Sequence, residues 1–149
     1  MLGVLNENQV YNILTTQVIG RLGCTDGKIP YIVPVTFAYD GEYIYGQSNE
    51  GEKLKLLRKN PNVCFEVELM SDMRNWQCVV LQGKFEELKN RKADKAREIL
   101  FQRIFPLMTS STVHKHEHGN EAIPDDDNRV KTIMYRIRIK KITGRFERA

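Results

Sequence analysis

The chain has 149 residues, which suits one domain with a single core over residues 1–149. Apolar residues make up 41% and charged residues 28%, a composition that excludes large-scale disorder. The net charge of +4 permits anionic ligands but does not indicate nucleic-acid binding, and no apolar run approaches the roughly 18–20 residues of a membrane span. We therefore expect a cytoplasmic protein that binds neither nucleic acid nor membrane.

The three cysteines are sparse and far apart in the chain. Cys24, Cys64 and Cys78 suggest neither a disulfide framework nor a paired-cysteine zinc site, which favours a reducing compartment. No clear base lies near any of them in the sequence. A nucleophilic thiol is therefore not expected, and no catalytic residue is assigned.

A short helix is predicted at residues 7–16, because Asn6 and Gln9 form a capping-box pattern. After this helix, the spacing of the apolar residues changes from the helical period to a period of two. Three strands are predicted next, at residues 20–25, 29–39 and 42–47. Asp26-Gly27 and Asp40-Gly41 are typical of the turns between them. Pro34 has no backbone N–H to donate to a neighbouring strand, which predicts an edge position or a bulge at this residue.

A second helix is predicted from the capping-box pair Asn49 and Glu52 to Asn60-Pro61. Further strands are predicted at residues 63–69, 76–86 and 132–147, and a long helix at residues 91–105. The last strand changes phase at Lys140-Lys141, which predicts a β-bulge. Residues 108–128 have no clear period and are expected to be a long connection.

Six strands joined mostly by short turns favour a mainly β fold. A parallel sheet would need helices between most of its strands. We therefore expect a six-stranded antiparallel barrel with peripheral helices, in which closure removes the sheet edges.

One segment combines several groups that bind phosphate. Residues 48–53 lie where a strand ends and a helix begins, so backbone N–H groups and a partial positive charge are available. Ser48 adds a hydroxyl group and Lys53 adds a cation. The alternative interpretation is a capped helix with a solvated lysine, and the pattern alone favours it.

Two other features have more than one interpretation. Trp76, which opens a strand, is either a core or interface aromatic or a flat surface for a planar ligand. His114, His116 and His118 alternate in a polar segment, which favours an exposed loop over a metal site. No metal ligand set is predicted.

Several segments, taken together in order and spacing, resemble the FMN-binding split-barrel superfamily, which is pyridoxamine 5'-phosphate oxidase-like. The branch that they resemble is that of flavin-nucleotide-binding proteins related to 5-nitroimidazole resistance proteins. The matching segments are residues 20–24, 30–37, 39–41, 44–48, 51–53, 57–61, 63–67, Trp76 and residues 142–145.

The resemblance implies an FMN-binding six-stranded split barrel and a homodimer with its cofactor sites at the interface. It implies that FMN contacts seven residues. Val35, Thr36 and Phe37 would lie along the isoalloxazine ring, Ser48 and Lys53 would hold the phosphate, and Trp76 would approach the flavin, either within its own chain or from the partner chain. The seventh, Gln47, stands where this branch often has histidine. Its amide can hydrogen-bond a flavin or ligand but cannot shuttle protons near neutral pH.

The function that follows is that of an FMN-dependent oxidoreductase acting on a small molecule. Gln47 weakens the case for nitro-drug reduction. Two alternatives remain: a haem- or other cofactor-binding split barrel without flavin turnover, and a barrel that has lost its ligand.

Overall fold

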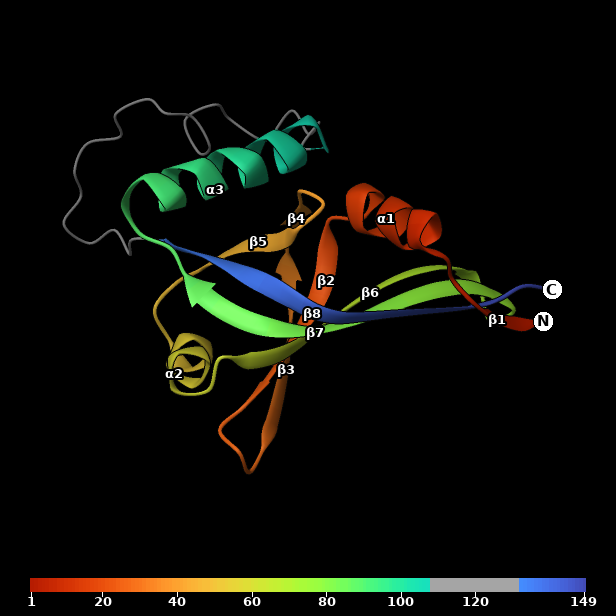
Figure 1. The fold of residues 1–149 in the computed structure, drawn as a ribbon, viewed down its shortest axis with the longest axis horizontal. Helices are drawn as coiled ribbons and strands as arrows, with labels where there is room; N and C mark the ends of the chain where they lie inside the picture. Colours follow the sequence, from red (N-terminus) through yellow and green to blue (C-terminus); the bar gives the residue numbers. More distant parts are fainter. Residues whose placement is uncertain (108–131) are drawn as a thin grey trace.

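The computed structural model describes residues 1–107 and 132–149 and consists of a curled antiparallel sheet with three α-helices around it (Figure 1). The sheet order is β3-β2-β6-β7-β8-β5-β4, and β1 pairs with β8. The strands are β1 Leu2–Val4, β2 Ile19–Thr25, β3 Pro30–Thr36, β4 Ala38–Tyr39, β5 Tyr43–Ser48, β6 Asn62–Asp72, β7 Asn75–Glu87 and β8 Ile133–Glu147. The helices are α1 Glu7–Thr16, α2 Glu52–Lys59 and α3 Asn90–Ile104, followed by a 3-10 turn at Phe105–Leu107.

The fold class is the predicted one, a mainly β split barrel with peripheral helices. Every strand pair is antiparallel. β1 and β4 add two short strands to the six predicted. β1 was missed because three residues are too few to show a period. None of the described helices is long and apolar enough to cross a membrane.

The β2–β3 hairpin projects from the body of the molecule (Figure 1). Its turn is held by Asp26, whose Oδ1 accepts from the backbone N–H groups of Lys28 and Ile29 at 2.8 and 3.0 Å. β3 is the edge strand of the sheet, which confirms the placement of Pro34. The strand predicted over 29–39 is interrupted after Thr36, and β4 then pairs with β5 instead of β2.

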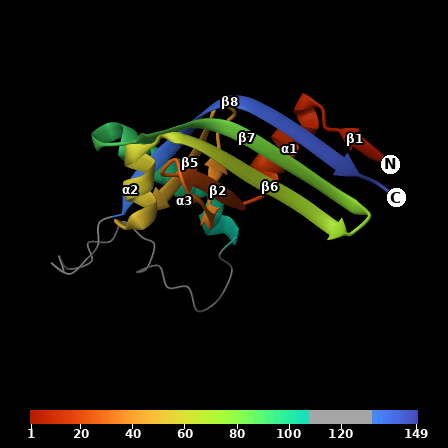
Figure 2. The ribbon, with the colours of Figure 1, turned by 90° about the horizontal axis from the view of Figure 1, so that it is seen from below.

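β6, β7 and β8 are long strands that run side by side (Figure 2). The register between β7 and β8 shifts at Gln82/Gly83: Gln82 pairs with Lys141, and Gly83 pairs with Ile139. Lys140 is therefore the extra residue of a β-bulge, which confirms the break in alternation predicted there.

Two apolar clusters hold the helices to the sheet. The main core fills the inside of the barrel. The helix α1 contributes Ile13 and Leu14 to it, and α2 contributes Leu54 and Leu57. Each of these side chains is at most 1% exposed, and burying one stabilises the fold by roughly 1.5–3 kcal/mol. The helix α3 packs elsewhere, because Ala96 and Leu100 belong to a separate cluster with Tyr45, Leu88 and Met134.

Candidate ligand-binding site

An open pocket of about 340 Å³ lies where three elements meet: β3, the end of β5 and the start of α2. It is lined by Pro34, Val35, Thr36, Gln47, Ser48, Asn49, Lys53 and Thr132. Five of the seven residues predicted to contact FMN are in this lining, although they come from segments separated in the chain. Pro34 and Thr132 were not predicted, and no local pattern marks either of them.

The start of α2 differs from the prediction, and the difference concerns the backbone N–H groups beside this pocket. The capping box of Asn49 and Glu52 is wrong: the N-cap is Gly51, which makes no side-chain cap hydrogen bond. In α1, by contrast, Asn6 and Gln9 form both bonds of the predicted box, at 2.8 and 2.9 Å. Because no side chain among the described residues caps α2, the backbone N–H groups of its first turn are available to an anion.

Ser48 is the buried polar residue of the pocket. It is the last residue of β5 and is 7% exposed, whereas its neighbour Gln47 points outward and is exposed. The Oγ of Ser48 donates to the carbonyl oxygen of Asn49 at 2.9 Å. This bond uses the hydroxyl proton, so Ser48 orients the chain entering the loop and retains acceptor capacity.

Lys53 is a half-buried cation one residue into α2. Within the described part of the chain it makes no ion pair. Burial lowers the pKa of its amine, and the nearby Cys24 thiol partly offsets that shift. Burial likewise raises the pKa of Cys24, against the effect of Lys53. The pocket therefore contains a desolvated positive charge whose compensation would come from an anionic ligand.

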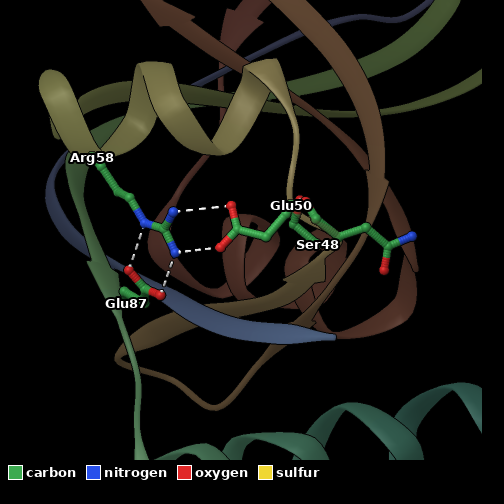
Figure 3. A network of polar contacts seen from close by, with 5 residues as sticks. Ser48, Glu50, Arg58 and Glu87 are labelled. Atoms are coloured by element: carbon green, nitrogen blue, oxygen red, sulfur yellow. Dashed lines mark hydrogen bonds and ion pairs between the residues drawn. The ribbon is translucent and has the colours of Figure 1, made fainter. Parts of the chain in front are cut away.

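A network of ion pairs fastens the loop before α2 (Figure 3). Arg58, near the end of α2, donates to both oxygens of Glu50 at 2.8 and 3.0 Å. It also donates to both oxygens of Glu87, at the end of β7, at 2.8 and 2.9 Å. Sequence reasoning assigned no role to Arg58, because its partners lie 8 and 29 residues away, outside any helical spacing.

Two of the predicted contact residues lie elsewhere. Phe37 is fully buried in the core, with its ring centroid 5.1 Å from that of Phe65, and it is not part of the pocket lining. Trp76 lines a small separate hollow with Phe146 and donates from Nε1 to Glu147 Oε2 at 3.1 Å. β7 begins near the chain termini, at the other end of the molecule from α2 (Figure 1).

A larger hollow of about 630 Å³ lies between β1, α1 and the second half of β8. Its lining includes Val4, Tyr11 and Ile142, together with Glu7 and Arg145. None of the seven residues predicted to contact FMN is in this lining.

Raised pKa values favour the neutral thiol over the nucleophilic thiolate at Cys24 and Cys78. Burial raises the pKa of Cys78 to about 12, helped by the Glu66 carboxylate that accepts from its Sγ at 3.3 Å. Among residues 1–107 and 132–149, no three histidine, cysteine or acidic side chains form a metal-binding group. The histidines of residues 114–118 lie outside the described residues.

Comparison with known proteins identifies the family. The family model described as pyridoxamine 5'-phosphate oxidase matches residues 6–146, and the chain belongs to this family. An uncharacterized protein of Rhizobium meliloti is 32% identical over 85 residues, which are 57% of this chain and 56% of that protein. The chain thus matches little more than half the length of this curated relative.

Solved structures share the fold over nearly the whole chain. A FAD-binding protein from Mesorhizobium loti is 27% identical, with a TM-score of 0.78 and coverage of 100% of this chain and 98% of that one. A putative 5-nitroimidazole antibiotic resistance protein from Bacteroides thetaiotaomicron is 19% identical, with a TM-score of 0.71 and coverage of 98% and 87%. A FAD-binding protein from Mycobacterium smegmatis is 20% identical, with a TM-score of 0.68 and coverage of 99% and 100%.

Proposed function

We propose that this protein is an FMN-binding flavoprotein that acts as a flavin-dependent oxidoreductase on a small molecule. The observation that carries the proposal is the convergence of Val35, Thr36, Gln47, Ser48 and Lys53 on one pocket. Membership of the pyridoxamine 5'-phosphate oxidase family and the similarity to the FAD-binding protein from Mesorhizobium loti support a flavin as the ligand.

The residues present fit a flavin phosphate. Lys53 supplies a half-buried cation, and the uncapped first turn of α2 supplies backbone donors. A single segment of this kind suits the one terminal phosphate of FMN, and we propose FMN rather than FAD for that reason.

The flavin ring would lie against β3. Thr36 would present a hydroxyl group and Val35 its backbone, because the Val35 side chain packs against the core. Gln47 would offer an amide that donates and accepts hydrogen bonds without exchanging a proton near neutral pH. A bound flavin supplies hydride and electron transfer, so the protein needs no nucleophile of its own. The side chains orient the ring, tune its polarity and exclude water from it.

We also propose a homodimer with its cofactor sites at the interface. Support comes from apolar side chains exposed on strands of the sheet: Ile19 at 52%, Ile32 at 70%, Met70 at 55% and Val80 at 40%. Exposed apolar surface of this kind marks interaction sites. Trp76 is remote from the pocket of its own chain, so its approach to a flavin would come from the second copy.

The absorption spectrum of the purified protein, followed by titration with FMN and FAD, tests this function. We expect flavin absorption bands at about 450 nm and tighter binding of FMN than of FAD. We also expect a reduced nicotinamide nucleotide to reduce the bound flavin. A protein that lacks a chromophore and binds neither flavin would refute the proposal. A haem Soret band would instead favour the haem-binding alternative.

A further inference from the structure

Arg58 has nearly all of its hydrogen-bonding capacity engaged by two carboxylates. Its Nε and Nη2 face Glu87, and its Nη1 and Nη2 face Glu50, in four contacts of 2.8 to 3.0 Å (Figure 3). The planar guanidinium matches a carboxylate with two parallel hydrogen bonds, a geometry that lysine cannot reproduce. The three side chains therefore form a defined clamp between α2, the loop before it and the end of β7.

Residues 1–107 and 132–149 offer few other restraints to the loop that this clamp holds. Asn49, Glu50 and Gly51 are all exposed, and a Cβ placed on Gly51 would have no heavy atom within 4 Å. The bond from Ser48 to the Asn49 carbonyl is local, and the bond from the Lys55 N–H to the Gly51 carbonyl belongs to the helix. The clamp therefore ties the middle of this loop to the sheet, because Glu50 is linked through Arg58 to Glu87 on β7.

The clamp also affects the electrostatics of the pocket. Glu50 adjoins the uncapped start of α2, where an unpaired carboxylate would repel an anionic ligand. Its bidentate pairing with Arg58 offsets part of that charge, because Arg58 is shared with Glu87. At the sheet end of the clamp, hydrogen bonding to Arg58 holds the pKa of Glu87 below its ordinary value, so the contact between Arg58 and Glu87 persists at neutral and mildly acidic pH.

We propose that Arg58 is a positioning residue for the phosphate of the bound flavin, an inference that rests on the proposed function. It acts through Glu50, by holding the loop so that the first turn of α2 and Lys53 face the same point, while Ser48 orients the chain that enters the loop. Arg58 does not itself contact the phosphate, because both carboxylates occupy its guanidinium.

The test compares FMN with riboflavin, which has the same ring and lacks the phosphate. Arg58→Gln and Glu87→Gln are each expected to weaken FMN binding about three- to tenfold, and riboflavin affinity stays as in the wild type. Arg58→Lys keeps the positive charge but lacks the planar guanidinium that pairs with two carboxylates, so its FMN binding is expected to be as weak as that of Arg58→Gln. Arg97→Gln is the matched control, since Arg97 pairs with Asp94 at 3.2 Å on α3, away from the pocket.

Two results would overturn the proposal. Equal loss of affinity for FMN and riboflavin would indicate a general structural role for Arg58. Tighter FMN binding by Glu87→Gln would mean that a released Arg58 contacts the phosphate directly.

Hydrogen exchange of the ligand-free protein separates failure of this inference from failure of the proposed function. The backbone amides of residues 49–53 are expected to exchange faster in Arg58→Gln than in Arg97→Gln. Unchanged exchange refutes the positioning role whether or not a flavin binds. If the wild type binds no FMN while exchange responds as expected, the clamp is real and the flavin function is wrong.

Discussion

Replacing Lys53 with methionine separates ligand binding from folding. Methionine is close to lysine in length and keeps the packing of the stem, while it removes the charge. One charge-assisted contact to a phosphate contributes about 1.5–3 kcal/mol, so Lys53→Met is expected to weaken FMN binding roughly 10–150-fold. Fluorescence or calorimetric titration of the ligand-free protein measures this change.

Stability is expected to respond in the opposite direction. The amine of Lys53 is desolvated and has no ion-pair partner among the described residues, which is why its pKa is lowered. The ligand-free Lys53→Met variant should therefore unfold at the same denaturant concentration as the wild type or at a higher one. Lys55→Met is the control, because Lys55 lies in the same helix, is exposed and, within the described part of the chain, pairs with Glu52 alone, at 3.5 Å.

The pH dependence follows from the same lowered pKa. Between that value and the ordinary 10.5, the unfolded chain binds the Lys53 proton more tightly than the folded protein, so the stability of the ligand-free protein rises with pH. FMN affinity falls over the same window, because the phosphate then binds an uncharged amine. Lys53→Arg stays charged and should flatten this fall. Wild-type FMN affinity in a folded Lys53→Met variant would remove Lys53 from the site and refute the reasoning.

Three further predictions concern the interface, the ring and the core. Sedimentation should show a dimer at micromolar concentration, and Val80→Asp should shift it towards monomer with weaker FMN binding; a wild-type monomer that still holds FMN would contradict the shared site. Thr36→Val should alter the reduction potential or the rate of flavin reduction while largely preserving binding, and complete loss of FMN would mean that β3 lies elsewhere relative to the ring. Tyr135 is 1% exposed, and its hydroxyl has no hydrogen-bond partner among the described residues. Since an unsatisfied buried polar group costs about 1–3 kcal/mol, Tyr135→Phe should keep or raise the free energy of unfolding, and a loss of more than about 1 kcal/mol in denaturant unfolding would contradict this placement.

Local patterns predicted most of the secondary structure. The capping box of α1, the edge position of Pro34 and the bulge at Lys140 all follow from interactions between residues close in sequence or from the period of a single strand. The errors occur where distant segments decide the outcome. β1 exists because β8 offers it a partner, and β4 leaves the line of β3 to pair with β5.

In the candidate site, too, some features follow from local sequence and others from contacts between distant segments. The phosphate site predicted at residues 48–53 rests on a local pattern, because a strand end, a hydroxyl, a helix start and a lysine follow one another in the chain. The cap, however, is Gly51 and not Asn49, a choice that the tertiary path of the loop makes.

By itself, the sequence determined the mainly β architecture, the family resemblance and the chemistry of the segment around Ser48 and Lys53, since all three depend on periodicity and short spacings. Tertiary structure alone decided that β3 lies beside that segment, that Phe37 turns into the core and that Trp76 lies at the far end of its own chain. It also created the Arg58 clamp. A guanidinium on α2 meets a carboxylate 29 residues away only after the sheet has curled, and no local spacing encodes that encounter.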